Sequence, residues 1–243
     1  MSEPDNIPTS AISWPGARRI IRSLFPPIDL FEDIADPADW PLLIAAEQKT
    51  NPRLKASIGN LDLIPASRRV GGPGSTYLMA PFTHISTDRP SRFSDGRFGV
   101  LYVGREFEVA LFETIHHHER FMRRTREAPG WTSQFREIVV DVAAELRDLR
   151  RGGGAELAHV LDPDSHVAGQ VLGLQLRNAG ADGILYPSLR CASGDCAALF
   201  YPDLAANAVQ GRHFDYHWDG QRVDFYRDAG AGAVFRLDRQ IVQ

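Results

Sequence analysis

The clearest hydrophobic pattern in the chain lies between Arg105 and Arg124, where apolar residues recur every three or four positions. This spacing predicts a helix with one buried stripe. The stripe comprises Phe107, Leu111, Ile115, His118 and Met122. Pro129 and Gly130 follow it and are expected to close the unit.

Glu113 is the anomalous residue of this helix, because its neighbours in sequence and one turn back are largely apolar. A carboxylate in such a segment needs a partner or a function. The stretch from Ser91 to His118 also contains Arg92 and Tyr102. We therefore expect the chemistry of the protein to centre on this strand and helix.

Two further helices are indicated by their start and stop signals. Residues 36–52 predict a helix of roughly three turns, beginning where Asp36 precedes Pro37. A later helix is capped by Asp164 or Ser165 and ends near a glycine. Its apolar positions are Val167, Val171, Leu172, Leu174 and Leu176.

Short apolar runs between these helices predict strands. They lie at residues 17–25, 98–103, 135–142, 183–188 and 196–202. Pro26 and Pro27 are expected to stop the first strand, and Asp219 with Gly220 predicts a hairpin near the C-terminus. Short strands mixed with separated helices indicate an α+β fold rather than a regular βαβ series.

A glycine-rich loop at residues 71–74 lies within a turn-rich segment, residues 55–90. Such a loop binds phosphate when it joins a strand to a helix N-terminus. Here Pro73 lacks an amide donor and no helical pattern is evident after Gly74. The sequence therefore favours an ordinary loop, and the loop at residues 151–154 is interpreted in the same way.

Composition limits the class of protein. The 243 residues are 43% hydrophobic and 24% charged, which fits a soluble globular protein of one domain with extensions. The net charge of -4 provides no general attraction to nucleic acid or anionic membranes.

The chain has no apolar run of roughly 18 residues and no signal-peptide pattern, so we expect a cytoplasmic protein. Cys191 and Cys196 are the only cysteines and are expected to stay reduced.

A local basic cluster follows the central helix and contains Arg120, Arg123, Arg124 and Arg126. It could form an anion site, but the sequence favours a solvated helix face.

Arg92, Tyr102, Glu113 and Ser188 form the first candidate site. A carboxylate in apolar surroundings can accept from a sugar hydroxyl and support a developing cation, while arginine binds diphosphate and tyrosine offers a flat face for a ring. Such a set would suit cleavage of a nucleotide sugar through an oxocarbenium-like state. The structural alternative is that Glu113 pairs with a buried arginine, Tyr102 belongs to the core and Ser188 caps a turn.

Two other chemistries have weaker support. The histidines at 116–118 are consecutive and point in different directions on a helix, so they cannot converge on one metal ion. Cys191 and Cys196 with His213 lack a fourth ligand and the usual zinc spacing. Cys191 or Ser188 would be the candidate nucleophile, but no G-x-S-x-G motif surrounds Ser188.

Four segments, residues 18–27, 91–104, 108–117 and 186–202, resemble the RES-domain family, the toxins of RES–Xre toxin–antitoxin systems. The glycine-arginine-aromatic motif of that family looks like Ser91-Arg92-Phe93, with Arg97 as the alternative position for its arginine. The first-strand arginine looks like Arg19, with Arg22 as the alternative. The other correspondences are Tyr102 for the strand tyrosine, Glu113 for the helix glutamate and Ser188 for the serine of the proline-serine motif.

The resemblance implies an ADP-ribosyltransferase-like fold, with a split or sandwiched mixed sheet flanked by helices. It also implies NAD+ as substrate, no metal, and an Xre-like antitoxin that occludes the pocket. We expect a toxin that cleaves the nicotinamide–ribose bond and transfers ADP-ribose to a host protein. The alternatives are a glycohydrolase or phosphorylase that depletes NAD+, a noncatalytic nucleotide-binding module, and an interaction subunit of a repressor complex.

The resemblance also assigns roles to the candidate residues. Arg19 and Arg92 would hold the diphosphate, Tyr102 and Ser188 would position the nicotinamide end, and Glu113 would accept from a ribose hydroxyl and stabilise the oxocarbenium ion.

We expect a single RES domain over residues 1–243, with a core at about 80–205. Residues 1–79, with a first strand and a helix, and the C-terminal hairpin at 206–243 would provide surface for an acceptor or antitoxin.

Overall fold

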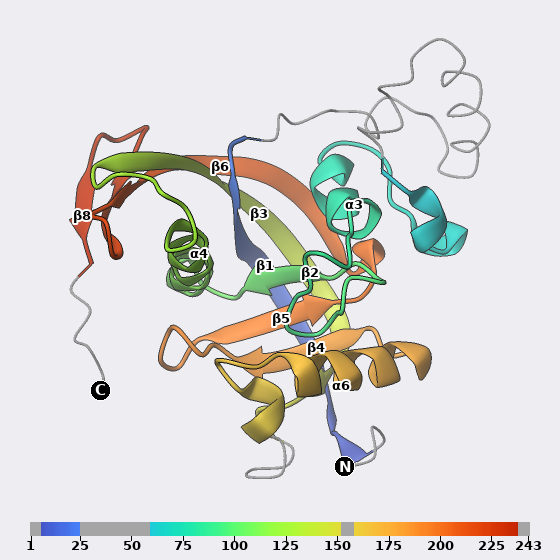
Figure 1. The fold of residues 1–243 in the computed structure, drawn as a ribbon. Coiled ribbons are helices and arrows are strands. Elements are labelled where there is room, and N and C mark those ends of the chain that lie inside the picture. Colours follow the sequence, from blue (N-terminus) through green and yellow to red (C-terminus); the bar gives the residue numbers. More distant parts are fainter. Residues whose placement is uncertain (1–5, 25–58, 152–157, 238–243) are drawn as a thin grey trace.

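The computed structural model describes residues 6–24, 59–151 and 158–237 (Figure 1). The predicted helix at 36–52, the proline stop at 26 and 27, and the glycines of the predicted 151–154 loop lie outside these residues. Within the described part of the chain, no helix combines the length and apolar character needed to cross a membrane.

The described residues form one eight-stranded mixed sheet with three α-helices, which confirms the predicted α+β class. The strands are β1 (Thr9–Arg22), β2 (Leu101–Gly104), β3 (Trp131–Asp148), β4 (Gly183–Pro187), β5 (Asp195–Leu199), β6 (Ala205–Trp218), β7 (Val223–Asp228) and β8 (Val234–Arg236). The helices are α3 (Ser75–Thr83), α4 (Phe107–Met122) and α6 (Val167–Asn178). Short 3₁₀ turns are η2 (Leu61–Leu63), η3 (Ala66–Arg68), η4 (Ala158–Leu161) and η5 (Pro202–Leu204).

The strand order is β1-β2-β5-β4-β3-β6-β7-β8, and β1 also pairs with β3. Strands β1, β2, β5, β4 and β3 therefore form a closed ring, from which β6, β7 and β8 extend. Among the strands that the structure describes, only β3 and β4 pair in parallel. Within the ring, β1 and β3 pair along most of their length. In contrast, β1 and β2 pair at one position, Arg18 with Gly104, so the ring is open between them.

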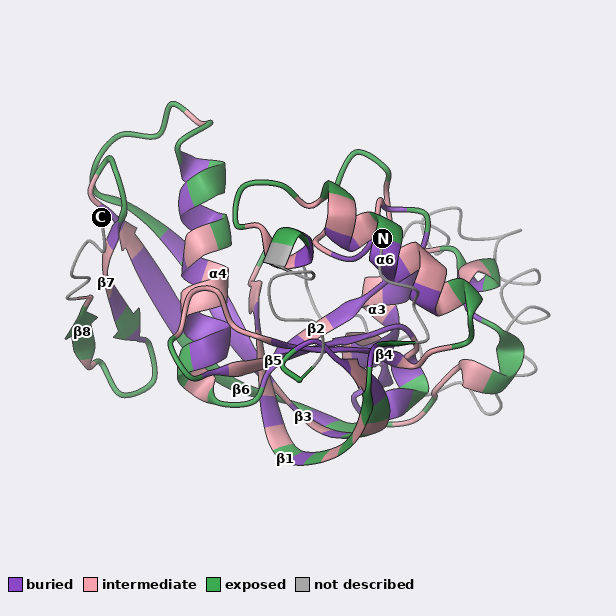
Figure 2. Cartoon of the chain, turned by 90° about the horizontal axis from the view of Figure 1, so that it is seen from below, coloured by how far each residue is buried: buried purple, intermediate pink, exposed green. Residues whose placement is uncertain are grey.

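Each α-helix covers a separate apolar cluster (Figure 1). The residues of α3 pack on the ring, those of α6 on the β4–β5 side, and those of α4 on the arch made by β3, β6 and β7. Figure 2 shows buried and exposed residues along α4, as expected for an amphipathic helix, and an exposed edge strand β8. The α4 stripe is confirmed, because Leu111, Ile115, His118 and Met122 are buried and Phe107 is half-buried.

Several predicted boundaries are wrong. Strand β1 begins at Thr9 rather than near Ala17, because its N-terminal half pairs with the last part of β3. Strand β3 is correspondingly longer than the predicted 135–142. The hairpin at Asp219 and Gly220 is confirmed by the antiparallel β6–β7 pair.

The prediction that no helix follows the glycine-rich loop is wrong, since α3 begins directly after Gly74. The helix was obscured by Pro81 within it, and it is stabilised by burial of Leu78 and Phe82. Gly74 has a positive φ of 78°, and a Cβ there would lie 1.9 Å from the carbonyl oxygen of Ala208. This loop therefore packs against β6, and tight packing explains its glycine without a bound phosphate.

The predicted start of α6 is also displaced. His166 is the N-cap residue, and the amides of Asp164 and Ser165 instead donate to Oδ1 of Asp162 in the preceding turn. Val167 and Val171 are exposed rather than buried, because α6 turns Leu172 and Leu176 toward the core. The predicted end is confirmed, because the helix ends at Asn178 and Gly180 follows with a positive φ of 79°.

Candidate functional site

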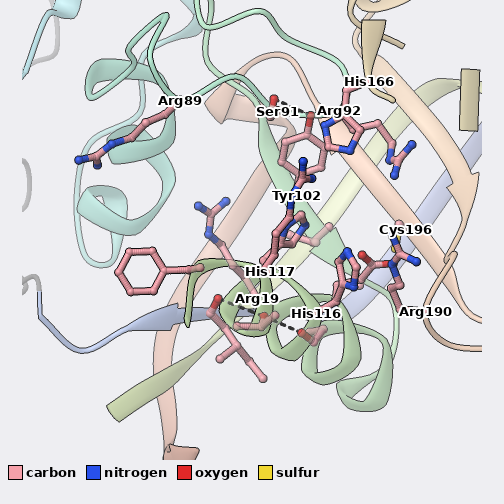
Figure 3. Close-up of a pocket in the computed structure, with 18 of the residues that line it drawn as sticks. Arg19, Arg89, Ser91, Arg92, Tyr102, His116, His117, His166, Arg190 and Cys196 are labelled. Carbon is pink, nitrogen blue, oxygen red and sulfur yellow. Dashed lines mark hydrogen bonds between the residues drawn. The ribbon is translucent and has the colours of Figure 1, made fainter. Parts of the chain in front are cut away.

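A pocket of about 780 Å³ opens where β1 and β2 diverge. Its walls come from residues 18–20 of β1, the loop at 88–92, residues 102–104 of β2 and one face of α4. Arg19, Arg92, Tyr102 and Glu113 all line it, so the structure brings four of the five predicted site residues into one cavity (Figure 3).

Ser188, the fifth predicted residue, lies behind Glu113 and is absent from the lining. Its hydroxyl donates to Oε1 of Glu113 at 2.7 Å. Oγ of Ser188 also accepts from the amides of Arg190 and Cys191, at 3.2 and 3.1 Å. Because these amides occupy the acceptor sites of the hydroxyl, its single proton is directed to the carboxylate. Ser188 thus caps a turn, as in the structural alternative, and also orients Glu113.

Tyr102 holds the loop that carries Arg92. Its hydroxyl accepts from the amide of Phe93 at 3.0 Å and forms a hydrogen bond with the Ser91 hydroxyl at 2.9 Å. These partners flank Arg92, whose Nη1 donates to the carbonyl of Asp162 at 2.9 Å. Burial raises the pKa of Tyr102 to about 12, so the phenol is neutral near pH 7.

Arg19 projects from β1 into the pocket without a compensating acid. Its Nη1 atom is buried and has no hydrogen-bond partner among the described residues. Burial lowers its pKa to about 10, against a small opposing effect of Tyr102. A buried guanidinium that lacks a partner is well placed to receive an anionic ligand.

The two alternative arginines lie elsewhere. Arg22 does not line the pocket, and its guanidinium carbon lies 5.3 Å from the ring centroid of Phe121. Arg97 is 72% exposed in its side chain and pairs with Asp95 at 3.1 Å. The geometry therefore favours Arg19 and Arg92 as the pocket arginines.

The pocket is strongly cationic, although the chain as a whole carries a net charge of -4. The lining arginines are Arg18, Arg19, Arg89, Arg92, Arg120, Arg124 and Arg190. The lining carboxylates are Asp88 and Glu113. Arg120 and Arg124 of the 120–126 cluster are exposed, as the solvated-face interpretation predicts, and they also line the pocket. A concave cationic site of this kind selects anions.

Two of the three consecutive histidines line the pocket, which the sequence pattern did not indicate. Burial and the charge of Arg190 lower the pKa of His116 to about 4, and burial also lowers that of His117 despite the opposing effect of Glu113. His118 points the other way and packs on Phe135 and Tyr216. Because their pKa values are lowered, the imidazoles of His116 and His117 are uncharged near pH 7. The positive charge of the pocket therefore comes from its arginines.

The thiol and metal alternatives receive no support. Cys196 lines the pocket, but burial raises its pKa to about 12, so it is a protonated thiol rather than a nucleophilic thiolate. Burial likewise raises the pKa of Cys191. No group of three or more metal-ligating side chains occurs within the described ranges.

Arg190 is a pocket residue that sequence reasoning missed. It follows Ser188 by two positions, and its Nη2 donates to the carbonyl of Pro163 at 3.4 Å. Burial lowers its pKa, and the charge of Glu113 opposes this effect, which places the two groups in the same electrostatic environment. Its position directly after the strand that ends in the proline-serine pair was the available signal.

The chain is similar to a curated protein and to a solved structure, and a family model matches it. Uncharacterized protein y4oC of Sinorhizobium fredii (strain NBRC 101917 / NGR234) is 26% identical over 230 residues, which cover 87% of this chain and 88% of that protein. The crystal structure of the M. tuberculosis MbcT–MbcA toxin–antitoxin complex aligns with 88% of this chain and 90% of that chain, at 12% identity and a TM-score of 0.43. The RES domain model matches residues 67–219, which is more than half of the sequence, and the chain therefore belongs to the RES-domain family.

Proposed function

We propose that this protein is a toxin that consumes NAD+ by cleaving the nicotinamide–ribose bond and transfers ADP-ribose to a host protein. The observation that carries the proposal is Glu113, an oriented carboxylate in a pocket whose charged side chains are mainly arginines. NAD+ has the matching features, a diphosphate and a ribose that develops positive charge as its glycosidic bond breaks.

The chemistry follows from the positions of the side chains. Arg19 and Arg92 bind the diphosphate, and Tyr102, which lines the same pocket, positions the nicotinamide end. Oε1 of Glu113 is occupied by Ser188, whereas Oε2 forms no hydrogen bond with any described residue and is open to a ribose hydroxyl. The carboxylate charge then stabilises the ribosyl oxocarbenium ion as the electron pair of the C1′–N bond passes to nicotinamide.

In this proposal Ser188 orients Glu113 and does not contact nicotinamide directly. Because its hydroxyl is fixed by two amides and donates to Glu113, it holds the carboxylate in one orientation. Pre-orientation of this kind strengthens the contact made in the transition state.

Release of nicotinamide tests the central step. Purified parent protein should release nicotinamide from NAD+, and Glu113→Gln, which keeps the side-chain volume and removes the charge, should lower that rate by at least about a hundredfold. Glu108→Gln is the matched control, because Glu108 is exposed on the same helix and outside the pocket. Equal rates for Glu113→Gln and the parent would remove Glu113 from the mechanism, and binding of NAD+ without turnover by the parent would favour a noncatalytic module.

The acceptor is tested by incubating the protein with NAD+ labelled in its ADP-ribose part and a cell extract. Label in a protein band supports transfer to a host protein. Free ADP-ribose identifies hydrolysis, and ADP-ribose 1″-phosphate identifies phosphorolysis.

The proposal includes an Xre-like antitoxin partner, which the family resemblance implies. Expression of the parent alone should arrest growth and lower cellular NAD+ or yield a modified protein. Glu113→Gln should do neither.

A further inference from the structure

The pocket continues along α4 well beyond the catalytic carboxylate. Phe121 lies two turns after Glu113, a rise of roughly 12 Å along the helix, and it also lines the pocket. This separation accommodates a diphosphate and a second ribose. Phe121 is 50% exposed, Arg22 lies over its ring at 5.3 Å from the centroid, and the His118 ring stacks on it at a centroid distance of 6.3 Å. An exposed aromatic ring with a cation against it is suited to stack on a nucleobase.

Two arginines flank this outer end from opposite walls. Arg124 follows Phe121 at the end of α4, and Arg89 belongs to the 88–92 loop. Figure 3 places Arg89 and Arg92 on opposite sides of Tyr102, so the loop supplies an arginine to each end of the pocket. Both Arg89 and Arg124 are exposed, and neither guanidinium has a hydrogen bond or ion pair with any residue that the structure describes.

The outer charges exceed what the diphosphate requires. Arg19 already presents a buried guanidinium nitrogen without a hydrogen-bond partner among the described residues, and Arg92 lies on the other side of Tyr102 from Arg89. Arg124, three positions after Phe121, and Arg89, which follows Asp88 in the 88–92 loop, are therefore further cationic groups of the pocket. A phosphate on the adenosine ribose would match that position and charge.

We propose that the outer end, Phe121 with Arg89 and Arg124, binds an adenosine that carries a 2′-phosphate, so that the preferred substrate is NADP+ rather than NAD+. The inference rests on the proposed function. Adenine stacks on Phe121, and the two arginines hold the 2′-phosphate from both walls. The bond that breaks is unchanged, and the products contain ADP-ribose 2′-phosphate in place of ADP-ribose.

Titration calorimetry with Glu113→Gln protein tests the inference, because this background retains the pocket while turnover is suppressed. NADP+ should bind at least about tenfold more tightly than NAD+. Adding Arg124→Ala or Arg89→Ala should remove most of that preference, because the NADP+ affinity should fall by a larger factor than the NAD+ affinity. Phe121→Ala should weaken both dinucleotides, and Arg126→Ala, which removes an exposed arginine outside the pocket, should change neither.

Equal affinity for the two dinucleotides, or tighter binding of NAD+, would overturn the inference and leave the proposed function standing. The same holds if Arg124→Ala and Arg89→Ala weaken NAD+ and NADP+ equally, because these arginines would then contact the shared diphosphate. If neither dinucleotide binds and the parent releases no nicotinamide from either, the proposed function itself fails. Melting curves of each variant confirm that the comparison is made on folded protein.

Discussion

The hydroxyl of Ser188 donates to Oε1 of Glu113 at 2.7 Å, although the two residues lie 75 positions apart in the chain. Glu113 comes from α4, and Ser188 follows directly after β4. The bond therefore links α4, which lines the pocket, to the end of the central strand β4. It fixes one carboxylate oxygen and leaves the other for a ligand.

Ser188→Ala should lower kcat more than it raises KM. Removing the hydroxyl frees the Glu113 carboxylate to rotate but leaves the pocket lining intact, so we expect kcat for nicotinamide release to fall about ten- to a hundredfold. Ser193→Ala is the control, because Ser193 is exposed in the same turn. A variant with parental kcat and raised KM would instead indicate that Ser188 acts on substrate binding.

Arg19→Met should stabilise the unliganded protein while abolishing dinucleotide binding. Arg19 is a buried cation whose Nη1 lacks a partner, so an apolar side chain of similar length should raise the free energy of unfolding by about 1 to 3 kcal/mol. Its neighbour is a matched contrast, because Nε of Arg18 lies 3.0 Å from Oε1 of Glu137. Arg18→Met should lower stability by about 1 kcal/mol.

Urea denaturation near pH 7 checks both variants. Equal destabilisation by Arg19→Met and Arg18→Met would show that Arg19 is a structural residue rather than one reserved for a ligand.

The sequence predicted elements whose signals are local. The α4 stripe and the β6–β7 hairpin depend on periodicity and on a two-residue turn, and both are confirmed. The full length of β1 could not be predicted, because residues near Thr9 are held by partners near Arg147 at the far end of β3. Helix α3 was missed for a related reason, since burial of its apolar face outweighs the local signal of Pro81.

The candidate site was predictable where a residue conflicts with its surroundings. Glu113 is conspicuous because an acid is rare in an apolar helical segment, and Arg92 and Tyr102 precede it closely. Arg89 and Arg124 could not be identified as site residues in this way, because their sequence neighbours give no sign that they are anything but solvated arginines. Only the fold reveals that they face one pocket from two walls.

Gly173→Ala should disturb the site through the backbone beside Arg92. A Cβ at Gly173 would lie 2.0 Å from the carbonyl oxygen of Phe93, so α6 or the loop must shift. The clash should outweigh the helix-propensity gain of about 1 kcal/mol and leave a net loss of about 1 to 2 kcal/mol. The KM for the dinucleotide should also rise severalfold.

The control for this variant is Val171→Ala, which changes an exposed residue of the same helix. Parental KM in a destabilised Gly173→Ala protein would mean that the loop keeps its position and only the helix moves.

His118→Leu should make the protein less sensitive to acid. Burial, with a smaller effect of Arg22, lowers the pKa of His118 to about 4, below the usual value near 6.5. Between these values the unfolded chain binds a proton that the folded chain does not, so the stabilising contribution is complete above pH 6.5 and is lost as the pH falls toward 4. From pH 7 to pH 5 the parent should lose about 2 kcal/mol more unfolding free energy than His118→Leu. Urea titrations at both pH values measure this difference, and His159→Gln, which changes an exposed histidine, should follow the parent. If His118→Leu lost stability in parallel with the parent, the acid sensitivity would arise from other groups, such as the pocket histidines.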